Sequence, residues 1–137
     1  MKKSFFNLAV LLLTALSFTA CKKEPTFDEK ITGEWQSVSV KLNGNDVTSY
    51  FSLDLELQAD KDFKATLKTT DIFSGNMTTT NPKGEWSTDG GEEIELIYDD
   101  TNESESYDVL EFSDEELVVE TTQDGDKIEI TFERKKE

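Results

Sequence analysis

Few side chains in this sequence suit catalysis by a nucleophile or a metal. Its 137 residues include no histidine and one cysteine, Cys21, which excludes Ser-His-Asp and Cys-His nucleophilic sites and the usual zinc ligand sets. No glycine-rich phosphate loop follows a strand and opens a helix, so nucleotide chemistry has no support. The 30 acidic residues allow many carboxylate pairs for glycoside hydrolysis, but nothing singles one out. We expect a protein that is not an enzyme, and an enzyme with paired carboxylates is the least favoured alternative.

Carboxylates also gather in four short segments that are candidates for a metal site. Their oxygens suit calcium, but no segment follows the EF-hand ligand spacing. Turns between strands select Asp and Gly for backbone reasons alone. We therefore expect no metal and no cofactor. The segments are Asp60-Lys61-Asp62, Asp89-Gly90-Gly91-Glu92-Glu93, Asp99-Asp100 and Asp124-Gly125-Asp126.

The first residues have the pattern of a signal peptide. Lys2 and Lys3 form a basic start, and an uncharged run over residues 5–18 follows, with an apolar stretch at its centre. That stretch is shorter than the roughly 20 apolar residues that a helix needs to cross a bilayer. We expect a signal peptide over residues 1–20 and no permanent transmembrane anchor.

Residues 16–21 resemble the lipobox of bacterial lipoproteins, in which a small residue such as Ala20 precedes a cysteine. The resemblance implies that the thiol of Cys21 receives diacylglycerol before cleavage on its amino side. It also implies that residues 21–26 form the lipidated end and a tether, and that the protein lies in the cell envelope as an outer membrane lipoprotein, periplasmic or surface-exposed. An ordinary secretory signal with an incidental cysteine is the alternative.

The charge of the mature chain limits its partners. Removing residues 1–20, which hold two lysines and no acid, leaves 12 of the 14 basic residues against 30 acidic ones, a net charge of −18. Such a surface repels nucleic acid and anionic head groups, so we expect no nucleic-acid partner. A solvated surface explains the charge better than a dedicated cationic partner does. The remaining chain suffices for one domain, which we expect to be a monomer.

Alternation of apolar and polar residues predicts an all-β protein. Residues 51–58 alternate without a fault, and residues 63–68 resume the pattern after a turn, so the two runs predict a hairpin. About eight antiparallel strands are expected, in a single up-and-down β-barrel whose closure removes exposed edges. A β-sandwich is the alternative. The other strands are expected over residues 93–98 and 127–134, and less regularly over 35–42, 84–88, 107–112 and 117–121.

Residues 69–83 are open to two interpretations. They extend two strands around a Ser-Gly-Asn turn, or they form a loose flap. The run Thr78-Thr79-Thr80 favours strand. The apolar side chains of Ile72, Phe73 and Met77 at such a tip belong either to a lid over a cavity or to simple packing, and we favour packing.

Two copies of the sequence Gly-Glu-Trp, at residues 33–35 and 84–86, each place a glycine one residue before a strand and a large aromatic just inside that strand. A tryptophan in any β core explains the second copy equally well. Residues 27–35, FDEKITGEW, resemble the first lipocalin motif, with a Phe-Asp start, a short turn of helix and Gly-x-Trp opening the first strand. The chain looks most like the small lipocalin-like lipoproteins common in Bacteroidetes. The resemblance implies a lipocalin-like barrel over residues 27–137.

In lipocalins a basic residue near the end of the barrel lies across the first tryptophan. The resemblance implies that Arg134 takes this place and closes the barrel base together with Gly33 and Trp35, by cation–π stacking and hydrogen bonds to backbone carbonyls.

The interior of an eight-stranded barrel is filled by side chains or holds one small ligand. We expect no polar group on the inward face of the clearest strands, so a ligand there would be lipophilic. The residues expected to line its site, all mid-strand on the apolar face, are Leu55, Phe63, Leu96 and Ile130. Two functions stay open: a non-catalytic module that binds a small hydrophobic molecule, or a filled barrel with a structural or protein-interaction role in the cell envelope.

Overall fold

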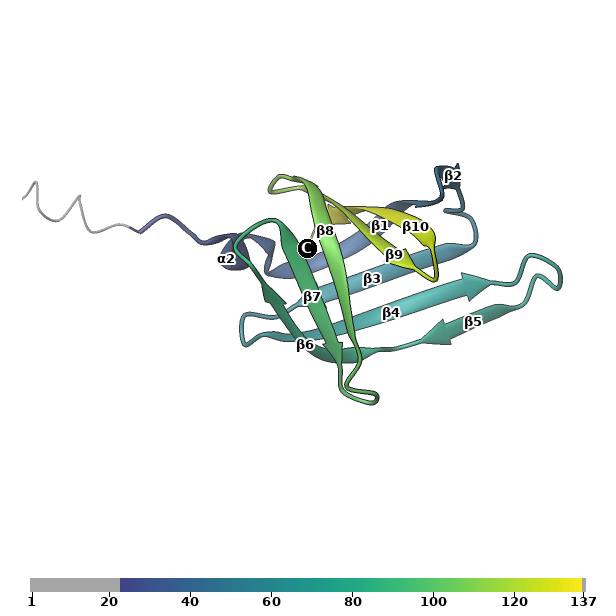
Figure 1. Ribbon diagram of the computed structural model, residues 1–137, viewed down its shortest axis with the longest axis horizontal. Coiled ribbons are helices and arrows are strands. Elements are labelled where there is room, and N and C mark those ends of the chain that lie inside the picture. Colours follow the sequence, from purple (N-terminus) through teal and green to yellow (C-terminus); the bar gives the residue numbers. More distant parts are fainter. Residues whose placement is uncertain (1–22, 137) are drawn as a thin grey trace, which may run out of the picture.

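All eight alternating segments form strands in the computed structural model, which describes residues 23–136. Each strand pairs antiparallel with the next one along the chain, and the last pairs with the first, so the sheet closes (Figure 1). The prediction of an all-β up-and-down barrel is confirmed, and the β-sandwich alternative is wrong. The barrel strands are β1 (Gly33–Leu42), β3 (Phe51–Leu57), β4 (Asp62–Thr70), β6 (Lys83–Thr88), β7 (Glu93–Tyr98), β8 (Ser104–Phe112), β9 (Glu116–Gln123) and β10 (Asp126–Arg134).

The signal peptide predicted over residues 1–20 and the predicted lipid site at Cys21 lie outside the described residues. Within residues 23–136, no helix combines the length and the apolar character that a bilayer crossing requires.

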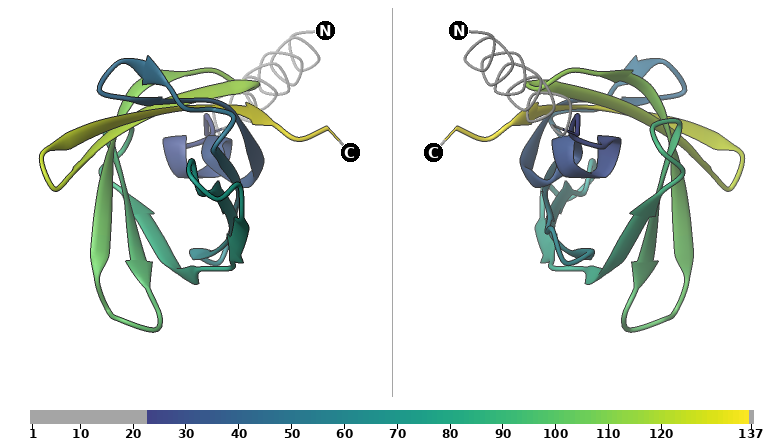
Figure 2. Two further views of the ribbon diagram at one scale, coloured as in Figure 1. Left: turned by 90° about the vertical axis from the view of Figure 1, so that its right-hand side faces the viewer. Right: turned by 90° about the vertical axis from the view of Figure 1, so that its left-hand side faces the viewer.

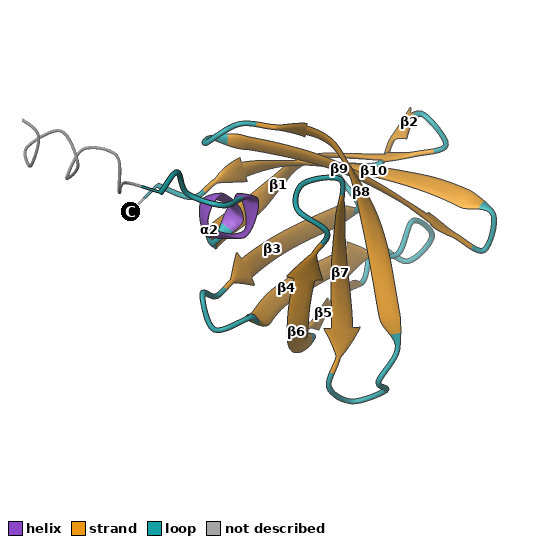
Figure 3. Ribbon diagram, turned by 60° about the vertical axis from the view of Figure 1, so that its left-hand side comes forward, coloured by secondary structure: helices purple, strands orange, loops and turns teal. Residues whose placement is uncertain are grey.

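One short helix, α2 (Phe27–Ile31), precedes the barrel and lies across one of its ends, which we call the base (Figures 2 and 3). The helix is only five residues long, and its start is fixed by a capping box. The Thr26 hydroxyl accepts from the backbone N–H of Glu29, and the Glu29 carboxylate accepts from the N–H of Thr26. Ile31, at the end of the helix, is fully buried. The opposite end of the barrel is called the mouth.

Tight turns fix the register of the strands at the mouth. Asn43 and Gly44 have φ values of 51° and 85°, as do Asp124 and Gly125. Two consecutive positive φ angles are typical of the type I′ turn, whose twist matches that of the flanking strands. The first of these turns leads into β2 (Asn45–Asp46), a two-residue strand beside β1 that the sequence did not predict.

The segment 69–83 forms a hairpin that extends β4 past the barrel and returns as β5 (Met77–Thr80) (Figure 1). The strand predicted at Thr78-Thr79-Thr80 is confirmed. The packing interpretation of its tip is wrong, because Ile72 is 67% exposed, Phe73 99% and Met77 67%. The turn needs no packing, since the Asp71 carboxylate accepts hydrogen bonds of 2.8 Å from the backbone N–H groups of residues 73 and 74.

Candidate functional site

The base of the barrel is closed by a tryptophan with a cation stacked on it. Trp35 is fully buried, and its indole N–H donates to the carbonyl oxygen of Ile31 at 2.8 Å. In the closing pair of strands, Trp35 lies opposite Arg134. The guanidinium carbon of Arg134 is 4.2 Å from the centroid of the indole, inside the distance at which cation–π attraction acts. The structure thus brings these two predicted residues together at the base.

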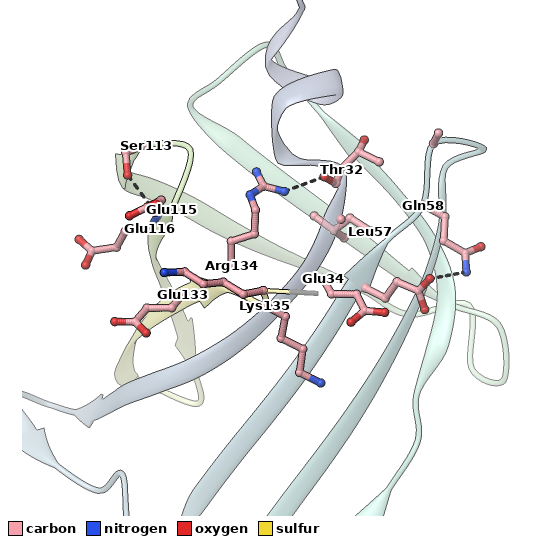
Figure 4. A pocket seen from close by; sticks show the side chains of 14 residues that line it. Thr32, Glu34, Leu57, Gln58, Ser113, Glu115, Glu116, Glu133, Arg134 and Lys135 are labelled. Atoms are coloured by element: carbon pink, nitrogen blue, oxygen red, sulfur yellow. Dashed lines mark hydrogen bonds between the residues drawn. The ribbon is translucent and has the colours of Figure 1, made fainter.

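Arg134 also ties three segments of the base to one another. Its guanidinium donates to the carbonyl oxygens of Lys30 at 2.6 Å and Asp114 at 2.6 Å, and to that of Thr32 at 2.9 Å (Figure 4). Gly33 makes room for it: a Cβ atom there would lie 2.7 Å from the guanidinium, and its φ of +136° disfavours any side chain. The predicted set for barrel closure therefore lies in one cluster.

The second Gly-Glu-Trp sequence builds a similar cluster beside the first. The indole of Trp86 donates to the carbonyl oxygen of Gln58 at 2.9 Å, and the ammonium of Lys61 lies 4.1 Å from its ring centroid. At Gly84 a Cβ atom would be 1.8 Å from the carbonyl oxygen of Ile97, so the glycine permits a close approach of two strands. Trp86 is therefore more than an ordinary core tryptophan, because a cation covers it.

Asp28 connects this second cluster to the helix. Its carboxylate accepts hydrogen bonds from the ammonium of Lys61 and from the hydroxyl of Thr88. Burial on its own raises the pKa of Asp28, but the bonds from Lys61 and Thr88 and the charge of Lys61 together outweigh it, so the pKa is lowered. Asp28 thus stays ionised and joins α2 to the turn before β4 and to β6.

A broad open groove of about 1,190 Å³ lies outside the base (Figure 4). Its walls carry charged side chains, among them Glu34, Glu115, Glu133 and Lys135. Because solvent reaches these charges, the groove offers no enclosed volume in which a small molecule would lose its water. A small molecule that must lose its water would bind inside the barrel instead.

A cavity of about 250 Å³ occupies the barrel interior toward the mouth. The four predicted residues, Leu55, Phe63, Leu96 and Ile130, all line it and are at most 7% exposed. The structure thus brings together at one cavity side chains from four strands. Further apolar residues continue its wall toward the mouth: Val40, Leu42, Val47, Phe51, Leu53, Ala65, Leu67, Pro82 and Ile128.

One wall of the cavity is polar, and its polar groups come mostly from β8 and β9, outside the clearest strands, while Tyr98 at the end of β7 departs from the expected apolar face. Glu105 lines the cavity, and one oxygen of its carboxylate accepts from the hydroxyls of Tyr98 and Tyr107, each at 2.6 Å. The other oxygen accepts from the side-chain amide of Gln123. Thr121 lies on the same wall and donates instead to a backbone carbonyl.

The strand register places these polar groups inside. Leu96 lies opposite Glu105 and Ile94 opposite Tyr107 in the β7–β8 pair. Directly opposed residues of an antiparallel pair share a face of the sheet, so Glu105 points inward with Leu96. The prediction missed this because the expected strand began at residue 107, whereas β8 begins at Ser104. Extending the alternation backwards from Val109 would have placed residue 105 on the inward face.

The hydroxyls of both tyrosines remain protonated at the cavity wall. Burial raises the pKa of Tyr98 and of Tyr107, and the hydrogen bond each donates to Glu105 raises it further. Within residues 23–136, none of the ion pairs includes Glu105. The carboxylate is therefore held by three neutral donors.

Two of the carboxylate segments considered for calcium act on the backbone of their turns. Asp89 accepts from the N–H groups of Glu92 at 3.0 Å and Glu93 at 2.9 Å, and these bonds lower its pKa. Asp60 accepts in the same way from the N–H of Asp62. Among the described residues, no group of three or more carboxylate, cysteine or histidine side chains is arranged to hold a metal ion.

Solved structures similar to this chain include one natural protein and one designed protein. A lipocalin-like protein from Bacteroides uniformis ATCC 8492 is 19% identical, with a TM-score of 0.49 over 77% of this chain and 99% of that one. A de novo designed fluorescence-activating β-barrel is 13% identical, with a TM-score of 0.51 over 82% of this chain and 100% of that one. At these identities the likenesses concern the fold alone. No curated protein matches the sequence.

The family comparison agrees with the barrel and its base. The sequence model of the lipocalin-like domain matches residues 31–119, which are 89 of the 137 residues. The match begins at the last residue of α2, includes both Gly-Glu-Trp sequences and extends into β9. The chain therefore belongs to the family of proteins with a lipocalin-like domain.

Proposed function

We propose that this protein binds a small, mainly apolar molecule in the cavity of its barrel and catalyses no reaction. The observation that carries the proposal is the cavity of about 250 Å³ toward the mouth, lined mostly by apolar side chains. Pockets for drug-sized ligands measure about 300–1,000 Å³, so the occupant is smaller than these. The lipocalin-like fold supports such a role.

We further propose that Cys21 carries a lipid and holds the barrel at the outer membrane. The support is the lipobox-like sequence after the uncharged run over residues 5–18. Labelled fatty acid should enter the wild-type protein, and Cys21→Ala should neither take up the label nor sediment with membranes. A labelled, sedimenting variant would contradict this proposal without touching the one about the cavity.

Binding is tested with the barrel free of its lipid, because detergent micelles would compete for an apolar probe. Residues 23–137 suffice, since every barrel strand, including the closing β1–β10 pair, lies within them. The neutral dye N-phenyl-1-naphthylamine is titrated into this domain and its fluorescence is followed. We expect saturable binding of one dye per barrel.

A filled cavity should abolish that binding. Ala65 lines the cavity and is 8% exposed, so Ala65→Leu places three further carbons in the space that the dye needs. Ser52→Leu adds a similar apolar side chain at an exposed position on the neighbouring β3 and serves as the control. The dye should bind the control and not the filled variant. No saturable binding to the wild type would leave a filled barrel and contradict the proposal.

A second function, docking to another envelope protein, is favoured by one feature, the exposed apolar tip of the β4–β5 hairpin. None of residues 71–77 is among the described residues that line the cavity. The tip of the hairpin therefore does not cover the cavity as a lid. Phe73→Ser should leave dye binding unchanged and should weaken recovery of any protein that crosslinks to the wild type in cells. Equal crosslinking of the wild type and the variant would contradict the proposal of docking through this tip.

A further inference from the structure

The charge inside the cavity indicates which class of small molecule fits it. Glu105 is the one charged residue among those that line the cavity. Its three hydrogen-bond donors, Tyr98, Tyr107 and Gln123, are all neutral. A partly buried carboxylate loses hydration that neutral donors restore only in part. If Glu105 served only to hold the two tyrosines, a glutamine would accept the same hydroxyl bonds without that loss.

The polar wall also has hydrogen-bond acceptor positions that the protein itself does not occupy. A carboxylate has about four lone-pair positions, and the protein occupies three of those of Glu105. Each tyrosine hydroxyl donates its hydrogen to Glu105 and keeps lone pairs of its own. Three oxygens, one from Glu105 and one from each of Tyr98 and Tyr107, thus stand on one wall of a cavity that is otherwise lined mostly by apolar side chains. An alkylammonium group has three N–H donors and no acceptor.

The aromatic rings of the cavity and the charge of the whole protein also favour a cationic ligand. Tyr98 and Tyr107 both line the cavity, and Phe63 lies edge-on to Tyr98 with 5.6 Å between ring centroids. Aromatic faces attract cations. The chain carries a net charge of −16, which raises the local concentration of cations and lowers that of anions. A fatty-acid carboxylate would face Glu105 with like charge.

We propose that the cavity selects a small primary amine with an apolar body, whose ammonium binds Glu105 between Tyr98 and Tyr107 while its body lies among the apolar side chains deeper in the barrel. This inference rests on the proposed function, because it names the ligand class of the same cavity. It assigns to Glu105 a role in ligand recognition and to the two tyrosines a role in positioning the carboxylate.

The test uses three ligands with nearly the same body and different heads: 2-phenylethylamine, 2-phenylethanol and 3-phenylpropanoate. Each is titrated at pH 7 into the domain over residues 23–137 with N-phenyl-1-naphthylamine bound, and displacement of the dye is followed. We expect the amine to bind at least about tenfold more tightly than the alcohol, as a charge-assisted hydrogen bond predicts, and the carboxylate not to bind. Equal affinities of amine and alcohol would overturn the inference, and this result needs no variant.

Two variants then assign the effect to one residue. Glu105→Gln keeps an acceptor for the tyrosines and removes the charge, so the amine should bind about as weakly as the alcohol, whose affinity should change less than about twofold. Glu111→Gln removes the same charge from an exposed position on the same strand and should leave the preference for the amine intact. Loss of the preference in both variants would show that overall charge, and not Glu105, selects the amine, and would overturn the inference.

The outcomes also separate this inference from the proposed function. Dye binding that all three ligands displace equally would remove the preference for an amine and keep the cavity as a binding site. A wild-type domain that binds neither the dye nor any of the three ligands would contradict both.

Discussion

Both ends of the barrel place aromatic rings beside charged groups, but the charges at the base are cations and the charge at the mouth is an anion. At the base, the cations of Arg134 and Lys61 cover Trp35 and Trp86, and Arg134 is bonded to three backbone carbonyls. At the mouth, an anion, Glu105, lies between two tyrosines next to open volume. The two stacked cations at the base bind partners within the protein, whereas Glu105 at the mouth takes part in none of the ion pairs among residues 23–136. This difference suggests that the base serves stability and the mouth serves binding.

The largest expected effect compares two leucines on the same strand. Leu57 is fully buried at the base, whereas Leu53 is partly buried and already faces the cavity. Truncating a packed core leucine costs about 2–5 kcal/mol, so Leu57→Ala should fall in that range and Leu53→Ala well below it. Urea unfolding of both variants measures the difference. Equal losses would mean that the interior toward the mouth is packed as tightly as the base.

Removing each of the two stacked cations should lower the free energy of unfolding by different amounts, and both losses should be smaller than that of Leu57→Ala. Arg134→Ala should cost about 1–2 kcal/mol, because it removes a cation–π contact and hydrogen bonds to carbonyls of the base. Lys61→Ala should cost less than about 1 kcal/mol, since the Lys61 side chain is 45% exposed and solvent screens its ion pair. Arg134→Lys should recover only part of the loss, because an ammonium cannot reach three carbonyls at once. Full recovery would show that charge alone accounts for the role of Arg134.

The sequence predicted the base far better than the mouth. Strict alternation in residues 51–58 fixes a strand and its buried face, and the likeness to the first lipocalin motif led to Arg134. The contact of Lys61 with Trp86 could not be predicted from the sequence. Lys61 stands in a turn with a φ of 75° and meets Trp86 only after β3, β4 and β6 have assembled. Glu105 was missed because a charged residue on an inward face contradicts the hydrophobic pattern on which strands are recognised. Polar residues that break this pattern mark the place where function competes with packing.

The smallest expected effect concerns alkaline pH and the mouth. Burial and the bonds to Glu105 raise the pKa of Tyr98 and Tyr107 in the folded protein, whereas tyrosines of the unfolded chain ionise near pH 10. Above about pH 10 the unfolded chain therefore binds fewer protons than the folded one, and stability falls as the pH rises. The stabilisation that comes from keeping both hydroxyls protonated is fully present below about pH 10.

Replacing one of these tyrosines should remove part of the pH dependence. Tyr107→Phe should be less stable than the wild type at pH 8, and the gap should narrow at pH 10.5 and 11. Urea midpoints at the three pH values measure it. A gap that stays constant would mean that the Tyr107 hydroxyl is no harder to ionise in the folded protein than in the unfolded chain.

The most direct test of the difference between base and mouth is a methyl-resolved NMR titration of the domain over residues 23–137 with N-phenyl-1-naphthylamine. The ring current of a bound dye shifts methyl groups that touch it. Shifts should saturate for the methyls of Leu53, Leu67 and Ile128, which line the cavity, and should be absent for those of Leu57 and Leu117, which are fully buried outside it. Shifts confined to the outer surface, or an equal response of all five residues, would contradict a binding cavity toward the mouth.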